Sequence, residues 1–165
     1  MGTALIQGAI RSGVVGAADV IGCDPYEKSR DAFVKATGAT ATADMDAVVA
    51  ASDVILLCTK PQDVSAALTD AVKTAAGGNR LVISIAAGVT LAALEAVTSE
   101  NFRIIRAMPN TPALVGHGAA GFCLGTRANP ADAATAHSLL GAVGLAVEVP
   151  ERLMDAVTGL SGSGP

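Results

Sequence analysis

Aromatic side chains are scarce in this chain of 165 residues, which has no Trp, one Tyr and three Phe. Hydrophobic residues nevertheless make up 51% of the chain, so its core must be built from Ala, Val, Ile and Leu. A chain of this length is long enough for one domain with a substantial core. The 18 glycines indicate tight turns and close backbone packing.

The chain also lacks the residue patterns of metal-binding, disulfide-rich and membrane proteins. Its three cysteines, Cys23, Cys58 and Cys123, are widely spaced and form no CxxC pair, which favours reduced thiols. His117 and His137 have no ligand-like spacing, so we expect no metal site. No apolar run approaches the roughly 20 residues that span a bilayer, and the first residues lack the order of a secretory signal. We therefore expect a cytoplasmic protein without a membrane partner.

Positive charge is limited as well. The 11 Lys and Arg residues are outnumbered by 15 Asp and Glu residues, and the net charge is −4. No basic cluster is present that could follow a phosphate backbone, so we expect no nucleic-acid partner.

What the chain does contain is an alternation of short apolar runs with helical stretches. Residues 54–58 and 81–85 are continuous apolar runs, which fit strands buried on both faces. We expect further strands at residues 20–23, 103–106, 119–124 and 145–149, and helices at about 2–12, 24–35, 61–74, 129–140 and 151–160. Strands that alternate with helices predict an α/β fold with a doubly wound parallel sheet.

Two residues near the start of the chain suggest a dinucleotide site. Gly2 opens a helix and would be the last glycine of a G-x-G-x-x-G turn, where a helix N-terminus binds a pyrophosphate. Asp24 follows an apolar strand about 20 residues later, where an acidic group binds ribose hydroxyls. An ordinary glycine and a helix N-cap are the alternatives for these positions, and Asp24 can fill both roles.

Three loops follow predicted strands at the edge where open parallel sheets bind ligands. Cys58-Thr59-Lys60-Pro61 ends one strand, and Ala86-Ala87-Gly88 ends the next with small residues that let a flat ring approach. In the third loop two prolines stiffen the backbone around Asn110, whose side chain offers a donor and an acceptor. Tight loop packing and, for Asn110, an Asx-turn are the alternatives.

A serine hydrolase motif is not supported. Ser161 follows Gly159 as in the nucleophile elbow G-x-S-x-G, but Ser163 stands where that motif needs its second glycine. We interpret this stretch as a sharp turn between two helices.

The motifs together resemble the pyrroline-5-carboxylate reductase family, the last enzyme of proline biosynthesis. The matching stretches are residues 1–5, 53–61, 84–90, 106–112 and 155–165, in the family's order and at about its spacing. The resemblance implies a Rossmann-like domain followed by an all-helical domain that dimerises. It also implies hydride transfer from NADPH or NADH to the ring C=N bond of 1-pyrroline-5-carboxylate, which gives L-proline.

The resemblance assigns cofactor contacts to ten residues. Met1 and Gly2 would border the pyrophosphate; Asp24 and Pro25 the adenosine ribose; Cys58, Thr59, Lys60 and Pro61 the cofactor cleft; Ala87 and Asn110 the nicotinamide. The family often has Asn where this chain has Met45, which removes one expected contact to the adenosine end. No catalytic residue is identified, because the resemblance places the substrate-binding donors in the helical domain.

The same resemblance implies an incomplete chain. We expect residues 1–149 to form an NAD(P)-binding domain with a mostly parallel sheet that lacks its first, central strand. Residues 150–165 would be the first helix and turn of a truncated helical dimerisation domain. We expect this fragment alone to be inactive, and homo-oligomers only from the complete chain. The alternatives are another reductase with a similar first domain, such as a hydroxyacid dehydrogenase, or a non-catalytic dinucleotide-binding module.

Overall fold

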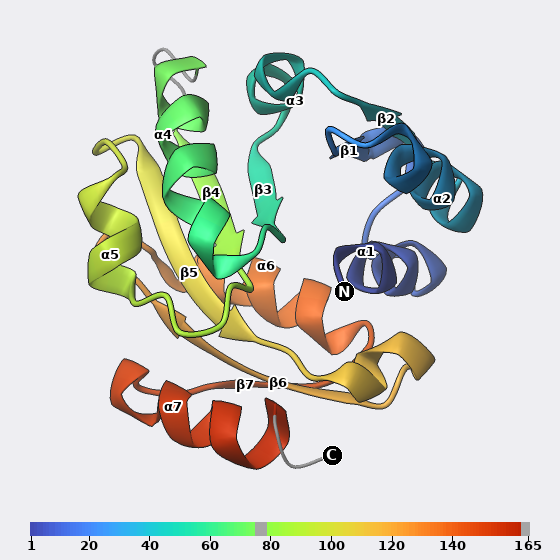
Figure 1. The fold of residues 1–165 in the computed structure, drawn as a ribbon. Helices are drawn as coiled ribbons and strands as arrows, with labels where there is room; N and C mark the ends of the chain where they lie inside the picture. The colour runs from blue at the N-terminus through green and yellow to red at the C-terminus, as the bar shows by residue number, and fades with distance from the viewer. Residues whose placement is uncertain (75–78, 163–165) are drawn as a thin grey trace.

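A computed structural model describes residues 1–74 and 79–162, which form an α/β fold with two sheets (Figure 1). In the smaller sheet β1 (Ile21–Cys23) pairs with β2 (Thr40–Thr42). The larger sheet has the order β3-β4-β5-β6-β7. Its strands are β3 (Val54–Leu57), β4 (Arg80–Ser84), β5 (Phe102–Met108), β6 (Gly118–Leu124) and β7 (Gly144–Glu148). All pairs are parallel except β5 with β6, so the predicted mostly parallel sheet is confirmed.

Helices cover both faces of the larger sheet. The helices of the described residues are α1 (Gly2–Arg11), α2 (Glu27–Thr37), α3 (Met45–Ala51), α4 (Val64–Thr74), α5 (Leu91–Ala96), α6 (Pro130–Gly141) and α7 (Met154–Val157), with short helical turns at Ala17–Asp19, Pro61–Asp63, Thr111–Val115, Glu151–Leu153 and Thr158–Gly162. Helix α2 packs against α1 and the smaller sheet. Figure 1 shows α1 and α6 on one side of this sheet and α4 and α5 on the other. Within the two described ranges, no helix is long and apolar enough to cross a bilayer.

Successive side chains of the central strands point to two separate cores. On β4, Val82 packs with the residues of α4 and α5, while Leu81 and Ile83 pack with those of α1 and α6. On β5, Ile104 packs in the core with α4 and α5, and Ile105 packs in the core with α1 and α6. This explains why residues 81–85, which lie in β4 and directly after it, form a continuous apolar run in the sequence.

The two sheets do not join. Among the described residues β1 pairs only with β2, and β3 pairs only with β4, so each has one unpaired edge. Strand β1 precedes β3 in the chain, with α2, β2 and α3 between them, and the two strands are not hydrogen-bonded to each other.

Several element boundaries differ from the sequence predictions. Helix α2 begins at Glu27 rather than at residue 24, because the Asp24 carboxylate accepts the Tyr26 N–H at 2.9 Å and holds the chain in a turn first. Strand β2 and helices α3 and α5 were not predicted individually. Of the C-terminal turn expected around Ser161, residues 163–165 lie outside the described part of the chain.

Gly8 allows α1 to approach the end of α6 closely. A Cβ atom at Gly8 would lie 2.2 Å from Val143 Cγ1 and 3.1 Å from the Ala142 carbonyl oxygen. We expect Gly8→Ala to lower the free energy of unfolding by about 1–2 kcal/mol, because overpacking outweighs the gain in helix propensity. Urea unfolding measures the change.

The matched control is Gly141→Ala in α6, where a new Cβ would meet nothing within 4 Å. It should raise the free energy of unfolding by up to about 1 kcal/mol. A Gly8→Ala chain at least as stable as the unaltered one would contradict the close packing.

Candidate functional site

The N-terminus of α1 lies against the carboxyl end of β3. A Cβ atom at Gly2 would lie only 2.7 Å from Cys58 Sγ, so the helix backbone touches this side chain. The helix has no side-chain cap, and the Met1 carbonyl accepts the Ala4 N–H at 2.9 Å. The first N–H groups of such a helix have no partner within it, and the helix dipole favours anions there. The structure thus brings Met1, Gly2 and Cys58 together into a place suited to a phosphate group.

Thr59 adds an unsatisfied donor next to this helix end. Its Oγ1 is buried and has no hydrogen-bond partner among the described residues. A buried hydroxyl without a partner is costly, and a ligand oxygen would satisfy it. Lys60 and Pro61 follow on the surface, where Pro61 begins a short helical turn. The strand-end loop predicted from the sequence therefore contains a buried hydroxyl that has no hydrogen-bond partner among the described residues.

The Cys58 thiol is neutral at physiological pH. Surrounding protein atoms desolvate Sγ and raise the pKa of this thiol to about 12, although the residue keeps a solvent-exposed surface. A neutral thiol carries no charge to repel an anion at the α1 N-terminus. Cys58 is therefore compatible with a phosphate neighbour and is a poor nucleophile.

Asp24 and Pro25 lie in the turn between β1 and α2. Asp24 Oδ1 accepts the Tyr26 N–H, but Tyr26 is the N-cap residue of α2, so the N-cap alternative for Asp24 is wrong. Arg30 Nη1 donates to the Asp24 carbonyl at 2.9 Å and to the Pro25 carbonyl at 3.1 Å. The Arg30 guanidinium thus holds the backbone of the turn in which the sequence predicts ribose binding.

Ala87 and Asn110 follow β4 and β5, two neighbouring parallel strands. Ala87 is exposed, and Gly88 after it adopts φ +75°, the left-handed region that favours glycine. Asn110 is buried, and its Oδ1 accepts the Ala119 N–H at 2.8 Å. Strand β6 thus uses one lone pair of the Asn110 carboxamide oxygen, and Nδ2 can still donate. The Asx-turn alternative is wrong, because the side chain makes no cap within its own loop.

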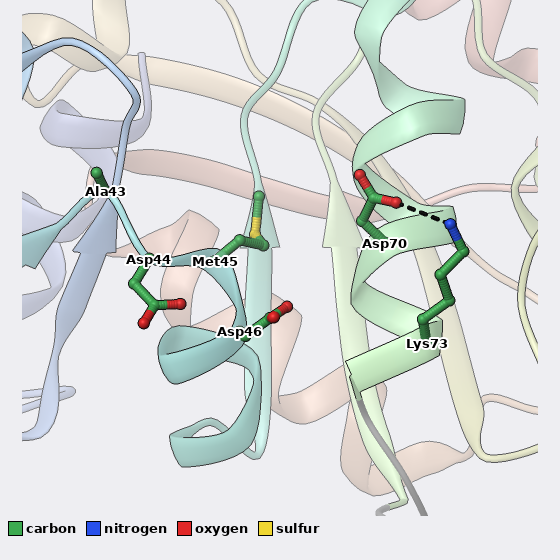
Figure 2. Close-up of a pocket in the computed structure, with 6 residues that line it drawn as sticks. All are labelled: Ala43, Asp44, Met45, Asp46, Asp70 and Lys73. Atoms are coloured by element: carbon green, nitrogen blue, oxygen red, sulfur yellow. Dashed lines mark hydrogen bonds and ion pairs between the residues drawn. The ribbon is translucent and has the colours of Figure 1, made fainter.

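A cavity of about 430 Å³ lies between α3 and α4, where the sequence predicts none (Figure 2). Its lining residues are Ala43, Asp44, Met45, Asp46, Asp70 and Lys73. Asp44 Oδ1 accepts the Ala47 N–H at 3.1 Å and so caps α3, and Lys73 Nζ lies 3.2 Å from Asp70 Oδ1. Met45 presents a thioether, a weak acceptor without a donor, where the resembled family often has an amide. The Asp44 cap is the signal in the sequence that locates α3, but it does not indicate a cavity.

Comparisons with known proteins identify relatives of this chain in sequence and in fold. Residues 1–88 match the profile of a family described as NADP oxidoreductase, coenzyme F420-dependent. A pyrroline-5-carboxylate reductase of Methanosarcina acetivorans is 43% identical over 165 residues, which are 100% of this chain and 61% of that protein. Among solved structures, a pyrroline-5-carboxylate reductase of Coxiella burnetii has a TM-score of 0.93 at 30% identity, covering 99% of this chain and 61% of that one.

A second solved structure is the pyrroline carboxylate reductase of Plasmodium falciparum with NADP bound, at a TM-score of 0.86 and 28% identity. The alignment covers 100% of this chain and 60% of the Plasmodium chain. The chain thus spans about three fifths of the relatives that it matches. It belongs to the family described as NADP oxidoreductase, coenzyme F420-dependent, and it resembles pyrroline-5-carboxylate reductases along its whole length.

Proposed function

We propose that this chain provides the dinucleotide-binding part of a reductase that converts 1-pyrroline-5-carboxylate to L-proline with NADPH or NADH. The observation that carries the proposal is the uncapped N-terminus of α1, which lies against the end of β3 where the Thr59 hydroxyl is buried without a partner. The names of its relatives and the NADP in the Plasmodium structure support the same cofactor and substrate.

Each predicted residue then has a defined task. The N–H groups at Met1 and Gly2 hold the pyrophosphate, and Asp24 with Pro25 borders the adenosine ribose. The cofactor cleft is lined by Cys58, Thr59, Lys60 and Pro61. Ala87 leaves room for the nicotinamide ring, and Asn110 Nδ2 donates to a polar group at that end. NADPH or NADH, when bound, supplies the hydride for the ring C=N bond; the residues of this chain bind and orient.

The wider organisation is part of the proposal. Residues 1–149 form the NAD(P)-binding domain, and residues 150–165 begin a helical dimerisation domain of a longer cytoplasmic protein. The run of helical turns that begins at Glu151 supports this division. Reductase activity, tested against a panel that includes hydroxyacids, is expected from a protein of the relatives' full length, of which this chain spans about three fifths.

Thr59→Val tests the cofactor site directly. Loss of the hydroxyl should weaken NADPH binding several-fold, since one hydrogen bond contributes about 1 kcal/mol. The same substitution should raise the free energy of unfolding of the ligand-free chain by about 1 kcal/mol, because it removes a buried hydroxyl that has no partner. Titration calorimetry and urea unfolding measure the two opposite changes.

Thr59→Ser, which keeps the hydroxyl, is the matched control and should retain most of the affinity. If Thr59→Val binds NADPH as tightly as the unaltered chain, Thr59 does not contact the cofactor. If neither the unaltered chain nor the Ser variant binds either dinucleotide, the proposed function itself fails.

A further inference from the structure

A single carboxylate oxygen links three segments that are distant in sequence. Glu151 Oε1 accepts the Leu91 N–H at 2.7 Å and lies 3.1 Å from Arg106 Nη1. Leu91 is the first residue of α5, Arg106 lies on β5, and Glu151 begins the short turn Glu151–Leu153. The link joins residues 60 positions apart in the chain.

Glu151 is the better shielded partner of a buried cation. Arg106 is only 4% exposed, so its charge needs a carboxylate nearby. Two are present: Glu151, whose side chain is 35% exposed, and Asp155, whose Oδ1 lies 3.3 Å from Nη2 but whose side chain is 93% exposed. Solvent weakens the second pair more than the first, so Glu151 is the principal counter-charge.

Glu151 also completes the N-terminus of α5. Thr90 Oγ1 caps this helix by accepting the Ala93 N–H at 3.2 Å, which leaves the Leu91 N–H to Glu151. The loop that leads into Leu91 carries Ala87 and the left-handed Gly88. Glu151 therefore fixes where this loop ends.

We propose that Glu151 is a positioning residue that holds the loop of residues 86–90 in register with β5, so that both can receive the nicotinamide half of a bound dinucleotide. This inference rests on the proposed function. Ala87 lies in that loop, and Asn110 follows the strand that carries Arg106. Glu151 acts through Leu91 and Arg106 and does not touch the cofactor itself.

The test compares a ligand that contains the nicotinamide with one that lacks it. Binding of NADH and of ADP-ribose, which lacks the nicotinamide, is measured by calorimetry for the unaltered chain, Glu151→Ala and Glu151→Gln. We expect Glu151→Ala to weaken NADH binding about fivefold or more while ADP-ribose affinity changes less than about twofold, because preorganisation is lost only at the nicotinamide end. Glu151→Gln keeps an acceptor for the Leu91 N–H and should recover part of the loss.

Two further measurements complete the experiment. Hydrogen exchange at the Leu91 amide should be faster in Glu151→Ala and close to normal in Glu151→Gln. Glu148→Ala removes an exposed carboxylate from neighbouring β7 and is the matched control, with no change in exchange or in either affinity.

Equal weakening of NADH and ADP-ribose binding would overturn the proposal, because it would indicate a general loss of structure. Unchanged exchange at Leu91 would overturn it as well. If the unaltered chain binds neither ligand, the proposed function fails, and the positioning role fails with it whatever the exchange shows.

Discussion

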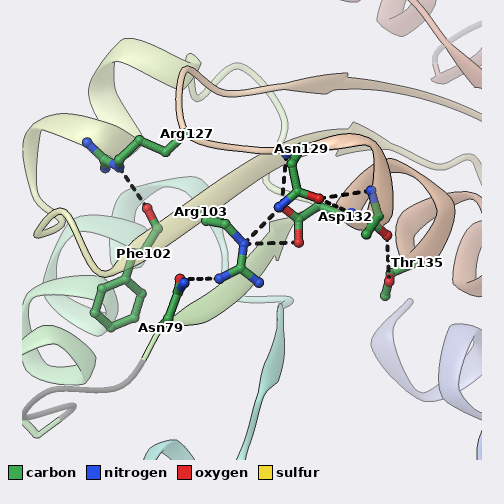
Figure 3. A network of polar contacts seen from close by, with 8 residues as sticks. Asn79, Phe102, Arg103, Arg127, Asn129, Asp132 and Thr135 are labelled. Carbon is green, nitrogen blue, oxygen red and sulfur yellow. Dashed lines mark hydrogen bonds and ion pairs between the residues drawn. The ribbon is translucent and has the colours of Figure 1, made fainter.

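Replacing Asp132 with Ala is expected to lower the free energy of unfolding by about 3–5 kcal/mol, the usual loss when one partner of a buried ion pair is removed. Asp132 is 4% exposed, and its two carboxylate oxygens lie 3.0 and 2.9 Å from Arg103 Nε (Figure 3). Without Asp132, Arg103 on β5 keeps, among the described residues, the hydrogen bond from Nη1 to the Asn79 side chain. A guanidinium whose side chain is 20% exposed would then lack its counter-charge.

The same substitution removes half of a helix cap. Asn129 Oδ1 accepts the N–H of Asp132 at 3.2 Å, and Asp132 Oδ2 accepts the N–H of Asn129 at 2.9 Å, which is a reciprocal capping box at the start of α6. Loss of such a cap costs about 1 kcal/mol by itself. Because the ion pair and the cap share the Asp132 carboxylate, Asp132→Ala removes both stabilising contributions at once.

Urea unfolding of Asp132→Ala, with Asp132→Asn beside it, measures this loss. The Asn variant keeps the shape and an acceptor but not the charge, so it should fall between the Ala variant and the unaltered chain. Asp31→Ala, an exposed position in α2, is the control and should stay within about 0.5 kcal/mol. A loss below about 1 kcal/mol for Asp132→Ala would show that the pair does not hold α6 to the sheet.

NADH should bind at least as tightly as NADPH, and Asp24→Ser should shift the ratio of the two affinities toward NADPH by about fivefold or more. A carboxylate about 4 Å from a 2′-phosphate is repelled by roughly 4 kcal/mol per unit charge at an effective dielectric near 20, before screening. A quarter of that energy gives a ratio of about five. The Tyr26 N–H holds the Asp24 carboxylate in one orientation, so the repulsion is not easily relieved by rotation.

Arg30 is the feature that opposes this preference. Its Nη1 donates to the carbonyl groups of Asp24 and Pro25, and the rest of the guanidinium can attract a phosphate. Lys28 is exposed in the first turn of α2 and acts in the same direction. Dissociation constants for NADH and NADPH are measured for the unaltered chain and for Asp24→Ser, with Glu27→Gln as the control in the same turn. A strong NADPH preference of the unaltered chain, or a ratio that Asp24→Ser leaves unchanged, would contradict the assignment of Asp24 to the ribose.

The strands and the longer helices were predictable because their signals are local. Continuous apolar runs mark β3 and β4, although only β4 is buried along nearly its whole length and β3 leaves Val54 exposed. The elements that escaped prediction are short: β2 has three residues, and α5 has six. Such segments contain less than two turns or two alternations, so periodicity does not identify them. The start of α2 was misplaced for another local reason, the bond from the Tyr26 N–H to the Asp24 side chain.

For the candidate site too, the positions of the residues were predictable from the sequence, whereas their contacts were not. Position after a strand places Asp24, Thr59, Ala87 and Asn110 at strand ends, and the structure keeps them there. The sequence contains no sign that Thr59 Oγ1 is buried without a partner or that Asn110 Oδ1 is already used by Ala119. These are properties of neighbours rather than of the residues themselves.

By itself, the sequence determined the alternation of strands and helices, the loops at the strand ends and the resemblance to a reductase family. Only the tertiary structure decided that Gly2 touches Cys58, that Glu151 meets Leu91 and that Asp132 meets Arg103. The last two pairs are 60 and 29 residues apart in the chain. Local periodicity extends over one helix or strand, whereas these contacts arise when two separate cores pack against opposite faces of one sheet and bring distant segments together.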